Sequence, residues 1–417
     1  MDNKETYLQI FMEKERVAAY KEQTIDVLVR VVPPAVSAES GERPKLNIGI
    51  ALDRSGSMDG NKMRQAREAA KYCVDELLPT DTFSAVIFDG KVDVLFTNQP
   101  ATNKEMLKRG IDRIEARGST ALHQGWVQAG LQVSERLSGG GIDRVLLITD
   151  GQANVGETRT DRIVQQAKDL AERGISTSTI GIGRGFNEDL LLPMAEAGQG
   201  NAWFVEAPQD MVRIFETELK GLVAQVGHTV TLGITPSPGV KVDDMLNDFE
   251  TDASGGYILP NLRAGSPLDV LVRLKIPAGE VGEALSAANF ELRYTEQATQ
   301  KPVTVTAMAE VAYDTAAAVA ELRTNDQVLT TVTLLTNARA RKEAMEYMDE
   351  GEFDDAASIL RMVATATDDA FAVTPSAELE QEIEAVRDLN RLIADRSNDM
   401  LTRKRMSYER ELRRKSR

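Results

Sequence analysis

Two aspartates and three hydroxyl residues stand at points of the sequence where side chains often bind ligands. Asp53, Ser55 and Ser57 form a D-x-S-x-S segment directly after an apolar run. Thr120 lies just before a stretch with helical spacing, and Asp150 ends a second apolar run. Hydroxyl and carboxylate oxygens are hard ligands that suit Mg²⁺ or Mn²⁺ in octahedral geometry, and they offer nothing that zinc or copper prefers. These residue types therefore predict a metal site for Mg²⁺, with Mn²⁺ or Ca²⁺ as alternatives.

The elements around these residues predict how the side chains come together. Between residues 44 and 225, apolar runs such as LNIGIAL, TFSAVIF and RVLLIT alternate with stretches of helical spacing. This alternation predicts a doubly wound, mostly parallel sheet with helices on both faces. Ligands bind such open α/β sheets in the crevice at the carboxyl ends of the strands. Since Asp53 and Asp150 follow two predicted strands, we expect the five oxygen-bearing side chains to converge at that edge.

Two β-rich segments flank the α/β region. Residues 7–40 and 226–313 contain runs of strand length, many of them alternating, separated by Gly, Pro and Asn-Asp turns. Each segment is short for an independently stable sheet, so we predict that both pair in one antiparallel β-sandwich. The α/β domain, residues 44–225, is then an insertion into this sandwich. Residues 315–417 are alanine-rich with helical spacing and predict a C-terminal α-helical region.

Composition limits the classes of function. Hydrophobic residues make up 42% of the chain and charged residues 27%, as in a soluble globular protein. The 49 Lys and Arg against 65 Asp and Glu give a net charge of −16, which argues against broad binding of nucleic acid or anionic membrane. No apolar run approaches the roughly 20 residues that span a bilayer, and the first residues lack the order of a secretory signal. We therefore expect a cytoplasmic protein. One cysteine and two histidines make zinc hydrolases and histidine-based triads poor candidates.

The order of the motifs resembles a known family. DRSGS at 53–57, GST at 118–120 and ITDG at 148–151 are similar to the metal-ion-dependent adhesion site (MIDAS) of von Willebrand factor type A (VWA) domains. The resemblance covers residues 44–225, and no position of the motif is missing. It implies that Ser55, Ser57 and Thr120 ligate the metal, while Asp53 and Asp150 act directly or through bound water. More narrowly, TDGQANVG at 149–156 is similar to bacterial VWA proteins related to the inter-alpha-trypsin inhibitor heavy chains.

The resemblance implies a metal-bridged interaction between proteins. In the family, an Asp or Glu of a partner protein commonly completes the octahedron of the ion. We therefore expect a non-enzymatic interaction module or scaffold, with an ATPase or a kinase and phosphatase system as the client that family context suggests. Two alternatives stay open: an Mg²⁺-dependent hydrolase or phosphatase with His123 as its base, and a structural protein that binds no ion.

Other residues have plainer interpretations. Cys73 shares a helical face with apolar residues, which predicts a buried and inert thiol. Trp126 lies on a similar stripe and is expected in the core. Asn154 and Gly156 either shape the loop beside the metal or simply form a turn. The tail 401–417 has eight basic and two acidic residues. We expect it to be a solvated helix or to balance the negative charge of the rest of the protein, rather than to bind nucleic acid or lipid.

Overall fold

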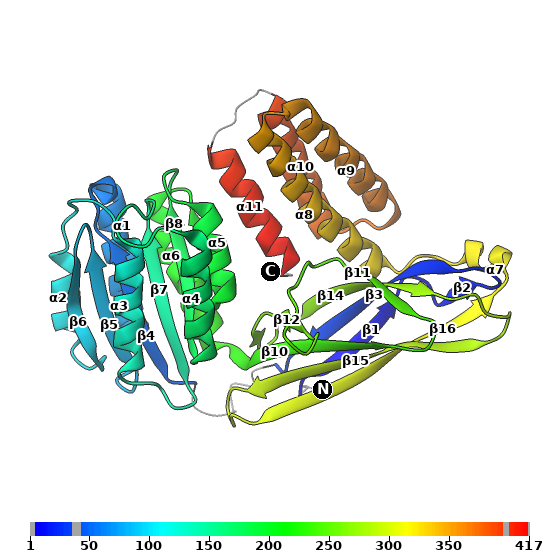
Figure 1. The fold of residues 1–417 in the computed structure, drawn as a ribbon, viewed down its shortest axis with the longest axis horizontal. Coiled ribbons are helices and arrows are strands. Elements are labelled where there is room, and N and C mark those ends of the chain that lie inside the picture. Colours follow the sequence, from blue (N-terminus) through cyan, green and yellow to red (C-terminus); the bar gives the residue numbers. More distant parts are fainter. Residues whose placement is uncertain (1–4, 36–42, 395–399, 416–417) are drawn as a thin grey trace. The chain divides into compact units, whose positions relative to one another are not determined.

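The computed structural model describes residues 5–35, 43–394 and 400–415. The chain divides into two compact units. One consists of Met1–Ser40, Gln225–Glu296 and Gln300–Arg417, and the other of Gly41–Ala224 with Gln297–Thr299. The predicted fold class is confirmed: a doubly wound α/β domain interrupts an antiparallel β-sandwich, which is followed by helices (Figure 1).

The α/β domain is built on a six-stranded sheet in the order β6-β5-β4-β7-β8-β9. Its strands are β4 (Leu46–Asp53), β5 (Thr82–Phe88), β6 (Val92–Pro100), β7 (Ile142–Thr149), β8 (Ile175–Ile182) and β9 (Gln199–Val205). All neighbours pair in parallel except β5 and β6. Every residue of β4 and β7 is buried, because helices cover both faces of the sheet.

Helices pack against each face of this sheet and form two apolar cores. They are α1 (Asn61–Glu76), α2 (Lys104–Asp112), α3 (Leu122–Ser134), α4 (Thr160–Glu172), α5 (Glu188–Ala197) and α6 (Met211–Val223). Residues of α1, α2 and α6 share one core, and residues of α3, α4 and α5 share the other. Cys73 lies fully inside the first core and Trp126 inside the second, which confirms both predictions of burial.

The β-sandwich consists of two sheets whose strands come from both sides of the α/β domain. One sheet has the order β1-β3-β14-β11, with β1 (Tyr7–Met12), β3 (Gln23–Val32), β14 (Leu268–Ile276) and β11 (Lys241–Met245). The other has the order β12-β10-β15-β16-β2, with β12 (Tyr257–Leu259), β10 (Gln225–Pro236), β15 (Ala284–Glu296), β16 (Pro302–Asp314) and β2 (Arg16–Ala18), and β13 (Leu262–Arg263) pairs with β10. All pairs are antiparallel except β16 with β2. The apolar residues of β3 and β14 join one core with those of β10, β15 and β16, so the N-terminal segment completes the sandwich.

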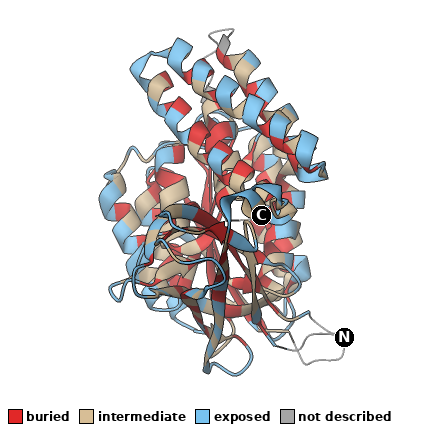
Figure 2. Cartoon of the chain, turned by 90° about the vertical axis from the view of Figure 1, so that its right-hand side faces the viewer, coloured by how far each residue is buried: buried red, intermediate tan, exposed pale blue. Residues whose placement is uncertain are grey.

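The C-terminal region is helical, as predicted. It contains α7 (Ala316–Glu321), α8 (Asp326–Glu350), α9 (Phe353–Val373), α10 (Ala377–Ala394) and α11 (Met400–Arg414). Gly351 ends α8 in the left-handed conformation, with a φ of 83°. Val328 and Leu335 of α8 pack on Leu28 and Leu271 of the first sandwich sheet, which ties the helices to the sandwich. Buried residues, in red, lie on the inner faces of the helices and of the strands, and exposed residues lie on the outer faces (Figure 2).

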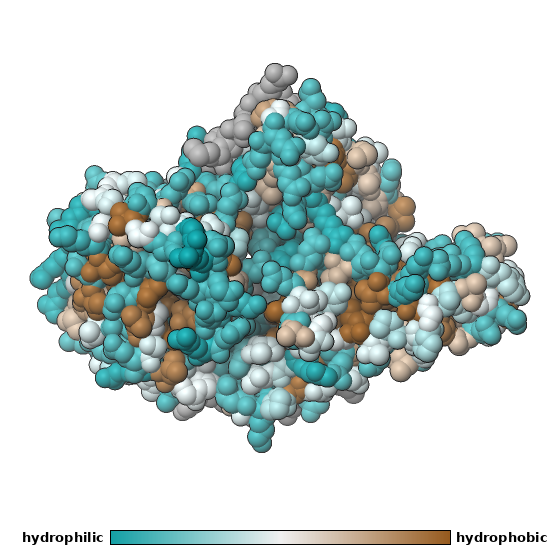
Figure 3. Space-filling model, viewed as in Figure 1, coloured by the Kyte–Doolittle hydropathy of each residue, from teal (hydrophilic) through white to brown (hydrophobic). Residues whose placement is uncertain are grey.

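The basic residues of α11 form ion pairs with acidic residues of the same unit. Arg403 pairs with Asp349, and Arg413 donates to Glu382 at 3.1 Å. These contacts agree with the counter-charge interpretation of the basic tail, of which residues 416 and 417 lie outside the described part. Hydrophilic side chains predominate on the face in Figure 3, with small apolar groups between them. Within the described ranges, no helix combines the length and apolarity that crossing a bilayer requires.

Candidate metal centre

The two predicted carboxylates lie at the same edge of the α/β sheet. Asp53 is the last residue of β4, and Asp150 directly follows β7. These strands are parallel neighbours, with Leu52 opposite Ile148, so their carboxyl ends adjoin. Asp53 is 0% exposed and Asp150 1% exposed. The sheet therefore brings two buried carboxylates together where the sequence predicted a ligand site.

Asp53 is held by two short hydrogen bonds. Its Oδ1 accepts the backbone N–H of Ser55 at 2.7 Å, and its Oδ2 accepts the hydroxyl of Thr149 at 2.6 Å. The Thr149 hydroxyl in turn accepts the N–H of Gly151 at 3.1 Å. Burial raises the pKa of Asp53 to about 6, although the bonds from Thr149 and Ser55 act in the opposite direction. At neutral pH the carboxylate is therefore ionised in a place that water solvates poorly, and a cation there is favourable.

The hydroxyl residues connect the two aspartates. Ser57 Oγ donates to Asp150 Oδ1 at 2.7 Å, and the Oγ atoms of Ser55 and Ser57 are 3.0 Å apart. With the bond from Ser55 N to Asp53, these contacts form one continuous chain from Asp53 through Ser55 and Ser57 to Asp150. The D-x-S-x-S spacing works because the chain turns sharply after β4 into a short 3₁₀ helix, Gly56–Met58.

Thr120 reaches the same place from the loop before α3. A Cβ atom added to Gly151 would lie 3.5 Å from Thr120 Oγ1 and 3.7 Å from Asp53 Oδ2. The Thr120 hydroxyl and the Asp53 carboxylate thus flank one glycine, whose lack of a side chain leaves the space between them open. All five predicted residues are brought together, and their role as metal ligands stays a prediction.

Asn154 positions Thr120 through two hydrogen bonds. Its side-chain Oδ1 accepts the N–H of Thr120 at 2.9 Å, and its own N–H donates to the carbonyl of Thr120 at 3.2 Å. Two residues on, Gly156 has a φ of 82°, which favours glycine. A Cβ there would also lie 3.2 Å from Nε2 of Gln124. The loop thus holds Thr120 through Asn154 and has its positive-φ residue at Gly156, and its place beside a metal stays a prediction.

The loop after β4 is fixed by Arg54, whose position sequence reasoning did not single out. Arg54 is only 7% exposed and pairs with Asp89 at 3.0 Å and with Asp93. The backbone N–H of Gly56 donates to the carbonyl of Gly118 at 3.1 Å, so the serine loop and the threonine loop are joined directly. These contacts hold the hydroxyl groups in place without using the hydroxyls themselves.

Two further side chains belong to the site and were missed. Thr149 supplies the hydrogen bond to Asp53 described above, and the ammonium of Lys62 pairs with Asp150 Oδ2. Lys62 also donates to the carbonyl of Ser57 at 3.2 Å. The available signals were a threonine at the end of the apolar run RVLLIT and a lysine in the first turn of the helix that follows the D-x-S-x-S segment. Sequence alone does not show that this threonine reaches Asp53 or that this lysine reaches Asp150.

His123, the candidate base of the hydrolase alternative, contacts a residue outside the site. Its Nε2 lies 2.6 Å from Oε1 of Gln166 on α4. The ring also lies near that of Trp126, with centroids 6.3 Å apart. The first contact joins α3 to α4, and the second lies within α3.

The donor set fits a hard divalent cation. Two carboxylates and three hydroxyls are all oxygen donors, which is the set that Mg²⁺ prefers. Within the part of the chain that the structure describes, no three His, Cys, Asp or Glu side chains gather closely enough to hold a metal. An ion at this place would need ligands beyond the two aspartates, and the three hydroxyls are the side-chain oxygens that lie beside them.

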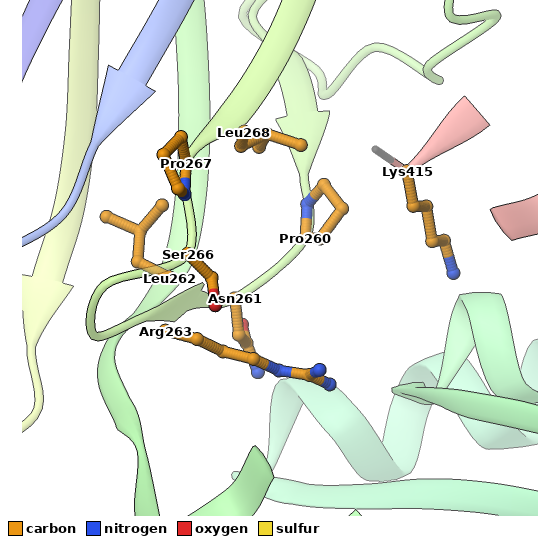
Figure 4. A pocket seen from close by; sticks show the side chains of 8 residues that line it. All are labelled: Pro260, Asn261, Leu262, Arg263, Ser266, Pro267, Leu268 and Lys415. Carbon is orange, nitrogen blue, oxygen red and sulfur yellow. The ribbon is translucent and has the colours of Figure 1, made fainter. Parts of the chain in front are cut away.

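A hollow of about 190 Å³ in the other unit offers a different chemistry (Figure 4). It is lined by Pro260, Asn261, Leu262, Arg263, Ser266, Pro267, Leu268 and Lys415. None of these eight described residues carries a carboxylate. It is therefore not a second cation site.

The fold and the site define the class of the α/β domain. Residues 47–217 match the family model of the von Willebrand factor type A domain, so this part of the chain is a VWA domain. Such domains commonly mediate metal-dependent interactions between proteins. The predicted resemblance is confirmed at the level of the domain.

Particular relatives share this domain over part of their length. An uncharacterized protein of Synechocystis, sll0103, is 28% identical over 201 residues, which cover 48% of this chain and 47% of that protein. The inter-alpha-trypsin inhibitor heavy chain H2 of Mus musculus is 28% identical over 223 residues, covering 51% of this chain and 23% of that one. The matched region thus spans about half or less of the length of these relatives.

A solved structure shares the fold of nearly the whole chain. The von Willebrand factor type A protein from Catenulispora acidiphila superimposes with a TM-score of 0.72, covering 93% of this chain and 91% of that one. The two sequences are 17% identical, so the likeness shows the fold alone.

Proposed function

We propose that this protein is a metal-dependent interaction scaffold whose VWA domain captures an acidic side chain of a partner protein. Asp53, Ser55, Ser57, Thr120 and Asp150 would hold Mg²⁺ as a complete MIDAS. The observation that carries the proposal is the unbroken chain of contacts from Asp53 to Asp150 through the two serines. Thr120 supports it, because its Oγ1 and Asp53 Oδ2 both lie within 4 Å of the position that a Cβ atom of Gly151 would take.

The chemistry of the residues explains why such a site would recognise a carboxylate. If the three neutral hydroxyls bind the ion directly and the two aspartates act through bound water, the charge of the ion would be poorly neutralised by its immediate ligands. When bound, the ion supplies a Lewis-acid position that an external carboxylate can occupy in place of water. Thr149 and Ser55 N keep Asp53 oriented, and Asn154 keeps Thr120 in place, so the chain need not rearrange to present its oxygens.

The proposal describes a binder that is not an enzyme. A hydrolase would need a base near the ion, and the contact of His123 with Gln166 gives that alternative no support. A cytoplasmic location and an ATPase or a kinase and phosphatase system as client belong to the same proposal. The buried, single Cys73 is compatible with a reducing compartment.

Calorimetric titration of the full chain with Mg²⁺, after treatment with chelator, tests the metal site. Asp53→Asn should weaken binding about tenfold or more, because it removes one of the two buried charges. Asp143→Asn is a matched control, since Asp143 is also a buried aspartate of this sheet but bonds to Asn47 and Ser138 near the start of β7. That variant should bind Mg²⁺ like the wild type. Absence of both heat and thermal stabilisation in the wild type at millimolar Mg²⁺ would refute the proposal.

A further inference from the structure

The ammonium of Lys62 sits among three loops at the candidate metal centre. It pairs with Asp150 after β7 and donates to the carbonyl of Ser57 at 3.2 Å in the loop after β4. A Cβ atom added to Gly183, in the loop after β8, would lie 3.7 Å from Lys62 Cε and 4.0 Å from Nζ. The side chain is 31% exposed, so the ammonium reaches inward from the rim.

The ion pair with Lys62 compensates the buried negative charge of Asp150. The Asp150 side chain is 0% exposed, and a buried carboxylate without a partner is strongly destabilising. Ser57 Oγ donates to Oδ1, and Lys62 supplies the only full positive charge that the described contacts place on Oδ2. Lys62 therefore compensates the charge of one of the two aspartates of the site.

The same contact opposes a divalent ion. An ion bound by Ser57 and Asp150 would share the Asp150 carboxylate with the ammonium of Lys62. The ion and the ammonium would then repel each other strongly, because both are positive and partly shielded from water. Any ion that takes Asp150 must therefore weaken or displace the contact with Lys62.

We propose that Lys62 is a tethered cation that holds Asp150 in the metal-free protein and competes with the divalent ion for it. This inference rests on the proposed function, because it presupposes an ion at this site. The lysine would keep the site folded when ion is scarce. It would also set the concentration of ion at which the site fills.

Lys62→Met tests the competition, with Lys71→Met as the matched control. Lys71 lies on the same helix, but it pairs with Glu68 and Asp112 away from the site, so both variants lose one charge. In calorimetric titrations of the full chain, Lys62→Met should bind Mg²⁺ at least about threefold more tightly than Lys71→Met. The rise in melting temperature on adding saturating Mg²⁺ should also be larger for Lys62→Met, because its metal-free form has lost the partner of Asp150.

The outcomes separate this inference from the proposed function. Equal or weaker affinity of Lys62→Met overturns the tethered cation and leaves the metal site intact. Absence of Mg²⁺ binding in the wild type and both variants refutes the metal site itself. Should Lys62→Met not fold, the lysine side-chain NMR signals of the wild type decide. A shift of the Lys62 signal that follows Mg²⁺ binding supports the inference, and an unmoved Lys62 signal during saturation overturns it.

Discussion

Thr149 offers a direct test of how the site is supported, because its hydroxyl would not need to touch the ion. It donates to Asp53 at 2.6 Å and accepts from Gly151 N at 3.1 Å, and the residue is fully buried. Thr149→Val keeps the shape of the side chain and removes both hydrogen bonds. We expect the VWA domain to lose stability and to bind Mg²⁺ more weakly.

The size of the stability loss follows from the two groups left without partners. Losing the bond from Thr149 to the buried Asp53 carboxylate should cost about 1 kcal/mol or somewhat more, because the acceptor is charged and shielded from water. The unpaired N–H of Gly151 adds about 1 kcal/mol. Together these losses lower the free energy of unfolding by about 2 kcal/mol. A mispositioned Asp53 should also weaken Mg²⁺ binding by about tenfold or more.

Thr179→Val is the matched control for this experiment. Thr179 is a buried threonine of β8 whose hydroxyl donates to the carbonyl of Leu191 at 2.9 Å. Losing that neutral bond should cost about 1 kcal/mol and leave Mg²⁺ affinity unchanged. Both tryptophans of the chain, Trp126 and Trp203, lie in the VWA domain, so tryptophan fluorescence during urea unfolding reports on this domain alone. If Thr149→Val matched Thr179→Val in both stability and Mg²⁺ affinity, the supporting role of Thr149 would be wrong.

Three further predictions follow from other contacts. Asn154→Ala removes the acceptor of the Thr120 N–H and should weaken Mg²⁺ binding several-fold, measured by calorimetry, and an unchanged affinity would contradict the positioning role. Burial raises the pKa of Cys73 to about 12, so a thiol reagent at pH 8 should react only as fast as the domain unfolds; rapid labelling of the native protein would show otherwise. The bonds from Arg339 lower the pKa of Asp244, so this pair stabilises the protein above the ordinary carboxyl pKa and loses its contribution as the pH falls through the lower folded value. Hydrogen exchange of α8 should therefore differ between the wild type and Asp244→Asn at neutral pH and converge in acid, whereas a gap that persists in acid would refute this sign.

The strands of the α/β domain could be predicted because each is marked by a local pattern in the sequence. Buried parallel strands are continuous apolar runs, so LNIGIAL and RVLLIT marked β4 and β7 directly. The ends of these strands then placed Asp53 and Asp150 without knowledge of any distance. Helix bounds are less easily predicted, because the end of a helix such as α2, at Asp112, depends on capping contacts that periodicity does not reveal.

The remaining features depend on contacts between distant residues. The three-residue strand β2 pairs with β16, about 300 residues further along the chain, and so short a run has no detectable periodicity. The contact of Lys62 with Asp150 depends on the direction in which α1 leaves its loop, and the bond from Thr149 to Asp53 crosses between neighbouring strands. Sequence shows that a lysine and a threonine are present, but it does not show which carboxylate each one reaches.

The measurement that tests the central claim most directly is a pull-down from a lysate of the source cell. Wild type and Asp53→Ala, both as full chains, are each used with Mg²⁺ and with chelator. The account predicts a partner that only the wild type retains, only in Mg²⁺, and that is released when a surface Asp or Glu of that partner is replaced. Identical sets of retained proteins in all four conditions would contradict recognition through the metal site.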